Sequence, residues 1–345
     1  MTTPFWRRDI HQDRRPFLLQ RNRIKAGLRA WFAGEGFVEV ECGALQVSPG
    51  NEAHLAAFRA DYRSEDGTAM PLYLHTSPEF SCKKLLAAGE TQIVDFARVY
   101  RNGEIGPLHS PEFTMIEWYR AGAPYDQIMT DCQQLCITAI DTAGGDSLRW
   151  KGRSCNPRLP FERLTLVDAF RRYASINLES HLDDRDGLAH AARDSGISIS
   201  SGDQWSDIFS KILVSHIEPQ LGDGRLTMLC DYPIAEAALA RPRADDPRFA
   251  ERFEMYACGV ELANGFGELT DATEQRRRFE AEMDLKDRLY NERYPLDDDF
   301  LTALQTMPEA SGVALGFDRL VMLATGARSI NDVLWTPFPK PGAAQ

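Results

Sequence analysis

The chain of 345 residues carries a net charge of −12, which argues against a broad nucleic-acid-binding surface. Its hydrophobic content of 43% is typical of a globular protein, and no apolar run approaches the length that a bilayer requires. The first residues lack the apolar core of a secretory signal, and the seven cysteines form no CxxC pair. We therefore expect a cytoplasmic protein with reduced cysteines, no membrane contact and no structural zinc site.

Helices and strands alternate along the first third of the chain. Hydrophobic periodicity and turn residues predict a helix over 16–34, strands over 37–41 and 72–76, a helix that opens at Ser77-Pro78-Glu79, and strands over 92–101 and 112–120. At the opening of the second helix, Ser77 suits the N-cap and Pro78 suits the first helical position.

The remaining elements are longer helices between further strands. Residues 121–225 are predicted to be a mainly helical insertion. Beyond it we expect strands over 229–234 and 253–269, a helix over 273–294, a strand over 311–316 and a helix over 318–326. The expected fold is α+β, with helices around an antiparallel sheet and a single domain over 1–345. The chain has no GxGxxG or GxxxxGK[ST] loop, which disfavours nucleotide binding by those routes.

Positive charge is concentrated at the start of the chain. The first thirty residues carry eight Arg or Lys and only two Asp. The solvated face of an amphipathic helix explains this cluster, and a docking site for an acidic partner is the alternative.

The strands over 92–101 and 112–120 are joined by an unusually long connection. Hairpin loops usually run from two to five residues, but this connection holds Arg101 and His109 and is about ten residues long. On the second strand, Phe113, Glu117 and Tyr119 share one face because side chains alternate. An aromatic surface beside a buried acid suits a flat base and a cationic group, although an ordinary half-buried hairpin remains the alternative.

A strand with little side-chain bulk precedes the last predicted helix. Gly312, Ala314 and Gly316 lie on one face of this strand, which would let a ligand approach the backbone. Arg319 falls in the first turn of the helix, where exposed N–H groups already favour anions. A glycine-rich core strand is the alternative interpretation.

Three segments together resemble the signature motifs of class II aminoacyl-tRNA synthetases. They read RNGEIGPLHSPEFTMIEWY, ELANGFGELTDATEQ and SGVALGFDRLVML in chain order. In detail they are similar to lysyl-tRNA synthetases, and most of all to the elongation factor P–(R)-β-lysine ligase family, a group of lysyl-tRNA synthetase paralogues. The resemblance covers roughly residues 16 to 335. It implies a class II catalytic domain, a homodimer, and the use of ATP and Mg²⁺.

The resemblance also implies roles for individual residues. Arg101, at the α-phosphate, and Arg319, at the distal phosphates, would be catalytic, and Phe113 would stack on adenine. The remaining residues of the ATP site would be Asn102, Gly103, Glu104, His109, Ser110, Glu261, Leu262 and Gly316. The residues around the amino acid would be Ser77, Pro78, Glu79, Glu117, Tyr119, Asn264, Glu268 and Ala314.

Three glutamates, Glu254, Glu261 and Glu268, recur at intervals of seven in a stretch of strand-forming residues and turn signals. A four-residue turn over 256–259 would place Glu254 directly opposite Glu261. Carboxylates paired in this way stand about 5 Å apart and repel each other, unless a divalent cation lies between them. Oxygen ligands suit Mg²⁺. In related synthetases the acid that matches Glu268 receives the side-chain ammonium of lysine.

The chain departs from the family pattern at three places. Gly103 stands where the motif normally has Glu, and Glu104 follows one residue later, so the residue that reads the adenine amino group is open. Cys42-Gly43 replaces a usual proline. The loop over 47–55 offers Asn51 and Glu52 as substrate contacts without a clear family match.

The sequence favours one function over two alternatives. Only about thirty-five residues precede the first motif, too few for an anticodon-binding OB-fold, and the acidic body disfavours tRNA. We therefore expect activation of (R)-β-lysine, or lysine, as an adenylate and its transfer to a lysine side chain of elongation factor P. The alternatives are a truncated lysyl-tRNA synthetase-like enzyme that forms lysyl-adenylate or lysyl-tRNA, and a non-catalytic regulatory paralogue.

Overall fold

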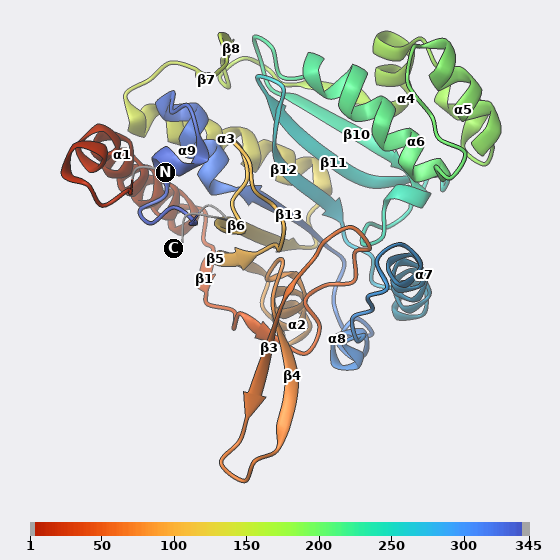
Figure 1. Cartoon of the computed structure of the whole chain (residues 1–345), viewed down its shortest axis with the longest axis horizontal. Helices are drawn as coiled ribbons and strands as arrows, with labels where there is room; N and C mark the ends of the chain where they lie inside the picture. The colour runs from red at the N-terminus through yellow and green to blue at the C-terminus, as the bar shows by residue number, and fades with distance from the viewer. Residues whose placement is uncertain (1–3, 340–345) are drawn as a thin grey trace.

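The computed structural model describes residues 4–339, and an eight-stranded sheet runs through its centre (Figure 1). The strand order is β1-β5-β6-β13-β12-β11-β10-β9. These strands are β1 (Val38–Val40), β5 (Gln92–Tyr100), β6 (Glu112–Ala121), β9 (Glu162–Thr165), β10 (Thr227–Pro233), β11 (Phe249–Ala257), β12 (Val260–Gly267) and β13 (Ala310–Gly316). Only the outer pairs, β1 with β5 and β9 with β10, are parallel. The predicted antiparallel sheet within an α+β fold is therefore confirmed.

One face of the sheet is covered by α1 (Arg8–Gly34), α3 (Tyr125–Ala143), α9 (Phe317–Thr325) and α10 (Ile330–Val333). In α1, Ile24, Leu28 and Phe32 recur at helical spacing and are buried in the main core. The helix begins eight residues before the predicted start and includes Pro16. Tertiary contact explains the extension, because the guanidinium of Arg14 donates to main-chain carbonyls near α10.

The opposite face carries α2 (Glu79–Ala87), α7 (Ala272–Tyr290) and α8 (Asp298–Ala303). Beside them lies a small sheet of β2 (Leu45–Gln46), β3 (Phe58–Arg63) and β4 (Ala69–Leu74), whose β3–β4 hairpin extends away from the body in Figure 1. The sequence pattern indicated β4 but neither β2 nor β3. The cavity described below lies on this side of the central sheet.

The segment 121–225 contains more than an insertion. Helix α3 packs in the main core, and β9 extends the central sheet. A short hairpin of β7 (Leu148–Trp150) and β8 (Arg153–Cys155) follows α3. The helices α4 (Leu166–Ala169), α5 (Arg185–Asp194) and α6 (Trp205–Ile212) form a second hydrophobic cluster at one end of the molecule (Figure 1). Its centre includes Phe170 stacked on Phe209, with ring centroids 5.2 Å apart.

The β11–β12 hairpin differs from the predicted turn. Its loop is only two residues long, and both Cys258 and Gly259 have positive φ, at 55° and 73°, as a type I′ turn requires. Tyr256 therefore pairs with Glu261, and one extra residue on β12 then shifts the register, so that Glu254 pairs with Asn264. The prediction that Glu254 lies directly opposite Glu261 is wrong, because the turn is shorter and the strand is bulged.

Among residues 4–339, none of the helices combines the length and the apolar character needed to cross a bilayer. All seven cysteines are free thiols.

Candidate active site

A cavity of about 300 Å³ opens over the middle of the sheet. Nine of the predicted ATP-site residues lie on its wall, namely Arg101, Glu104, His109, Ser110, Phe113, Glu261, Leu262, Gly316 and Arg319. Four of the predicted amino-acid-site residues do so as well, namely Ser77, Glu79, Asn264 and Ala314. Others, namely Pro78, Asn102, Gly103, Glu117, Tyr119, Glu254 and Glu268, lie off the wall. The structure thus brings together segments that are far apart in the sequence.

A single row of side chains crosses the sheet beneath this cavity. In the strand register, Asp95 on β5 pairs with Glu117 on β6, and Glu117 pairs with Ala314 on β13. Ala314 in turn pairs with Asn264, and Asn264 pairs with Glu254. Because directly paired residues point to the same face of a sheet, these five residues form one line across the site.

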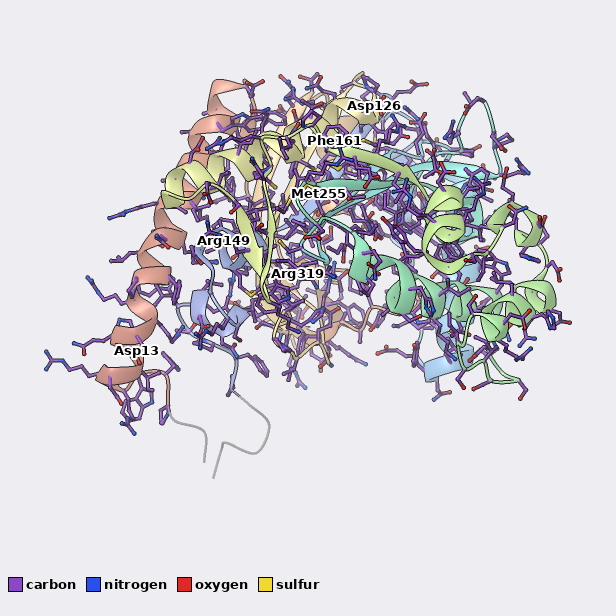
Figure 2. All side chains as sticks on the ribbon, turned by 90° about the horizontal axis from the view of Figure 1, so that it is seen from above. Asp13, Asp126, Arg149, Phe161, Met255 and Arg319 are labelled. Carbon is purple, nitrogen blue, oxygen red and sulfur yellow. The ribbon has the colours of Figure 1, made fainter. Side chains whose placement is uncertain are left out.

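Arg319 holds one end of the cavity together. Its guanidinium donates to the Glu261 carbonyl oxygen at 3.0 Å and to the Glu261 carboxylate at 3.3 Å. It also lies 2.8 Å from Nε2 of His109, which must accept because a guanidinium only donates. Figure 2 shows Arg319 in the interior of the view, whereas Asp13 lies at the periphery on α1. The α9 helix, β12 and the 101–111 loop therefore meet at this one side chain.

His109 is suited to remain neutral. Burial lowers its pKa, and the positive charges of Arg319 and Arg101 lower it further, against the opposing effect of Glu104. A neutral imidazole can accept the hydrogen bond from Arg319 without charge repulsion.

Arg101 and Phe113 form a second feature of the same end. The guanidinium carbon of Arg101 lies 5.5 Å from the Phe113 ring centroid. Arg101 is a quarter exposed, and its nearest acid is Glu104, at 4.0 Å. Gly103 has a φ of +84°, so the loop takes a backbone conformation here that a Glu would adopt only with strain. Glu104, and not position 103, faces the cavity.

An acidic group lies beside Arg319. Glu254 accepts from Arg252 at 2.7 Å and from the Tyr256 hydroxyl at 2.6 Å. Burial and Glu254 raise the pKa of Glu261, against the opposing effect of nearby arginines. Glu218, on a 3₁₀ turn (Glu218–Gln220), joins the group, and burial together with Glu254 and Glu261 raises its pKa to about 7. The sequence analysis missed Glu218, because it lies in the insertion. The carboxylates of Glu218, Glu254 and Glu261 repel one another, and a divalent cation that prefers oxygen ligands would relieve this repulsion.

Behind Glu79, at the other end of the cavity wall, lies a buried lysine that the sequence did not predict. The Lys83 ammonium lies 2.5 Å from Glu79 and 2.6 Å from Glu268, and its side chain is 0% exposed. Although burial opposes it, Glu268 and Glu79 raise the pKa of Lys83. The spacing of four residues between Glu79 and Lys83 on a helix is a sequence signal that could have indicated this pair. The pairing with Glu268 depends on tertiary structure.

Glu117 lies beside this ion pair. Its carboxylate accepts from the Ser77 hydroxyl at 2.6 Å and from the Tyr119 hydroxyl at 2.5 Å. Burial and the nearby Glu79 carboxylate raise the pKa of Glu117 to about 8. Burial also raises the pKa of Glu268 to about 7, with Lys83 opposing this effect. Two carboxyl groups, those of Glu79 and Glu268, contact the Lys83 ammonium, and Glu117 lies beside them, so this end would gain electrostatically from further positive charge.

Two local predictions for this end need correction. Helix α2 begins at Glu79 with Pro78 as its N-cap, one residue later than predicted, but the Ser77 hydroxyl still accepts from the Glu79 N–H at 3.1 Å. Gly312 does not open the strand to a ligand. A Cβ atom there would lie 2.2 Å from the Tyr119 ring and 2.5 Å from Glu268, so this glycine makes room for those side chains.

In the loop over 47–55, the two residues predicted as substrate contacts, Asn51 and Glu52, have different surroundings. Asn51 is buried, and its amide donates to the Pro295 carbonyl at 3.3 Å, which makes it a structural residue. Glu52 lies on the cavity wall.

Comparison with known proteins agrees with this geometry. The family model for tRNA synthetases class II (D, K and N) matches residues 7–341. The chain therefore belongs to the class II tRNA synthetase superfamily.

Curated relatives place it more narrowly. The chain is 37% identical to an elongation factor P–(R)-β-lysine ligase of Proteus mirabilis, with 93% of this chain and 94% of the relative covered. It is 37% identical to a protein of the same name from Haemophilus ducreyi and 38% identical to one from Salmonella paratyphi B, with 92% of this chain covered in each case. The chain belongs to the elongation factor P–(R)-β-lysine ligase family.

Proposed function

We propose that this protein uses ATP to activate (R)-β-lysine, or lysine, as an adenylate and then transfers it to a lysine side chain of elongation factor P. Membership in the ligase family supports this reaction. The observation in the structure that carries the proposal is the charge separation within one cavity. Arg101 and Arg319 stand at one end of the cavity wall and Glu79 at the other, where Lys83 pairs with Glu79 and with Glu268 behind the wall.

Each end of this cavity suits one substrate. The cationic end complements the phosphates of ATP, and the acidic end complements the two ammonium groups of a diamino acid. Both oxygens of Glu268 lack a hydrogen-bond donor among the described residues, apart from the charge contact with Lys83. A substrate amine would satisfy this buried carboxylate. The remaining amine would lie near Glu79, Glu117 and Ser77.

In the first chemical step, a carboxylate oxygen of the amino acid attacks the α-phosphorus of ATP. A bond forms between these atoms, and the bond from phosphorus to the pyrophosphate oxygen breaks. No general base is required, because the attacking group is already anionic. Arg101 would hold the α-phosphate and Arg319 the departing phosphates, so the protein contributes positioning and charge stabilisation. Phe113 would stack on adenine, with Glu104 as the acid nearest the base.

In the second step, the neutral amine of the acceptor lysine attacks the acyl carbon of the adenylate. An amide bond forms, the acyl–phosphate bond breaks, AMP leaves and the amine loses a proton. The Mg²⁺ that is usual for class II synthetases would be held by Glu254 and Glu261, where it would neutralise charge on the phosphates. Replacement of Glu261 by Gln should then remove most adenylate formation, and full activity in EDTA would overturn the metal assignment.

The proposal also includes that the protein is a homodimer, that residues 1–345 form a single domain and that the acceptor is a protein rather than tRNA. A truncated lysyl-tRNA synthetase-like enzyme and a non-catalytic paralogue are the competing functions. The discriminating experiment measures ATP–pyrophosphate exchange with α-lysine and β-lysine, followed by transfer of labelled amino acid to elongation factor P or to bulk tRNA. We expect exchange and protein labelling. Efficient tRNA charging would favour the synthetase-like enzyme, and absence of exchange would favour the non-catalytic paralogue.

A further inference from the structure

Two cysteines that are forty positions apart in the sequence meet behind the acidic end of the cavity. Cys42 follows β1, and Cys82 lies on α2 directly before Lys83. Their sulfur atoms are 3.7 Å apart. A carboxylate oxygen of Asp95 completes the group, and the three ligand atoms all lie within 4.8 Å of one another. No other group of three or more such ligands occurs at this spacing among residues 4–339.

The separation of the two sulfurs matches a specific coordination geometry. Thiolates bound to Zn²⁺ at about 2.3 Å and at the tetrahedral angle stand about 3.8 Å apart. A disulfide bond would require a separation of about 2.05 Å. Asp95 is already oriented, because its carboxylate accepts from the Cys42 N–H at 3.0 Å. We propose that Cys42, Cys82 and Asp95 form a binding site for a soft divalent cation, with Zn²⁺ as its occupant.

The chemistry of the ligands separates this site from the acids beside ATP. Sulfur ligands select zinc and exclude Mg²⁺ or Ca²⁺, which prefer oxygen. Cys82 and Asp95 are buried, whereas Cys42 is half-buried, so the site has a path to solvent. A fourth position is open to a further ligand, as in zinc sites with three protein ligands.

His75 supplies a second observation in the same region. Its main-chain N–H donates to Ala44, two residues after Cys42. Its Nε2 lies 2.7 Å from the Arg98 carbonyl and must donate, so Nδ1 carries the lone pair. That Nδ1 is buried and has no hydrogen-bond partner among the described residues. His75 lies outside the group of three whose ligand atoms are within 4.8 Å of one another, so its Nδ1 would reach a cation held there only after a rearrangement.

The site adjoins the acidic end of the cavity. Asp95 pairs directly with Glu117 across β5 and β6, and Cys82 precedes Lys83 on α2. A bound cation would therefore fix the position of α2, which carries both Glu79 and Lys83. From the lack of a CxxC pair the sequence analysis expected no structural zinc site, whereas these two cysteines are forty positions apart and meet only in the fold.

Metal content of the full chain tests the proposal. The protein is purified without a histidine tag, in a phosphine reductant and without chelator, and its zinc is measured by mass spectrometry. We expect about one zinc ion per chain in the wild type, with loss in Cys42→Ser and Cys82→Ser. Cys132→Ser is the matched control, since Cys132 is also a buried thiol but lies on α3. This control should retain its zinc.

A second measurement covers the case in which Cys82→Ser fails to fold. Wild-type protein stripped of metal is titrated with Co²⁺, and a thiolate charge-transfer band should appear that is missing in Cys42→Ser, whose half-buried position tolerates the change. Equal zinc in the wild type and in Cys42→Ser would overturn the proposal. The proposal would also be overturned if the wild-type protein contained no zinc and gave no cobalt band. That outcome holds as well if Cys42 and Cys82 form a disulfide when the protein is exposed to a low-molecular-weight disulfide.

Discussion

The two ends of the cavity differ in how far their charged side chains are exposed to water. At the phosphate end, Arg101 and Arg319 are 25% and 22% exposed and belong to a loop and to the start of a helix. At the amine end, Lys83 and Glu268 are at most 1% exposed and belong to a helix and to the end of a strand. The phosphate end is partly open to water, whereas the charges of the Lys83–Glu268 pair lie out of contact with water.

Because of this difference in burial, removing a charged side chain should have a different consequence at each end of the cavity. A buried ion pair is strongly destabilised when one partner is removed, because the other charge stays buried without compensation. When a partly exposed arginine is removed, water can solvate the groups that it contacted, so the folded state loses little stability. The main consequence is a slower reaction, because the arginine no longer stabilises the charge of the transition state. We therefore expect substitutions at the amine end to affect folding, and substitutions at the phosphate end to affect the rate.

The largest expected effect is on stability. Lys83→Met should lower the free energy of unfolding by about 3–5 kcal/mol, because Glu79 and Glu268 lose their shared cation. The adjacent Lys84, 27% exposed and paired with Asp297 and Asp299, is the comparison, and Lys84→Met should cost less, because Asp299 is exposed and the buried Asp297 still accepts from the Phe300 N–H at 2.9 Å. Urea unfolding of both variants measures the difference. Equal losses would contradict the expectation that the buried ion pairs of Lys83 matter more to stability than the partly exposed pairs of Lys84.

At the phosphate end, Arg101→Ala should reduce the rate of adenylate formation by at least about 10²-fold, because one preorganised charge at the α-phosphate is lost. Its unfolding midpoint should stay close to that of the wild type. Arg98→Ala is the control, since Arg98 lies on β5, three residues before Arg101, and pairs with Glu112 outside the cavity. Near-wild-type turnover in Arg101→Ala would mean that a residue other than Arg101 contacts the α-phosphate.

Between the two ends, Ala314 sets the height of the cavity floor. It lies in the row between Glu117 and Asn264, and it places a methyl group on the floor. Ala314→Gly should raise kcat/KM for α-lysine relative to β-lysine by about one to two orders of magnitude, the discrimination expected from a methyl-sized change. Adenylation of both isomers by both proteins checks this ratio. An unchanged ratio would assign Ala314 to packing alone.

The smallest expected effect, counted per pH unit, is a pH dependence at the amine end. Burial and Glu79 raise the pKa of Glu117 from 4.5 to about 8, so the folded protein keeps a proton that the unfolded chain loses in this range. Stability should therefore fall as pH rises from about 4.5 to 8, by up to about 1.4 kcal/mol per pH unit from this group. Glu117→Gln should reduce that slope. The same slope in both proteins would contradict the assignment.

The positions of these groups explain why some site residues were predictable. Strand alternation places Glu117 and Tyr119 on one face, and helix geometry places Arg319 at an N-terminus. Those local rules, with the motif resemblance, located Arg101, Phe113 and Ala314, which the structure brings to one cavity. Local rules did not locate Glu218 or Lys83.

The sequence by itself determined the antiparallel α+β fold, the faces of the motif strands and the family, because these depend on periodicity and on short motifs within one segment. Only the tertiary structure decided which charges meet. The two-residue turn pairs Glu261 with Tyr256 and so separates it from Glu254 in register. The strand order brings Glu268 to Lys83, and the joint of β1, α2 and β5 brings Cys42 to Cys82. The physical reason is that a side chain's direction follows from its own backbone, whereas its partner depends on how distant elements pack.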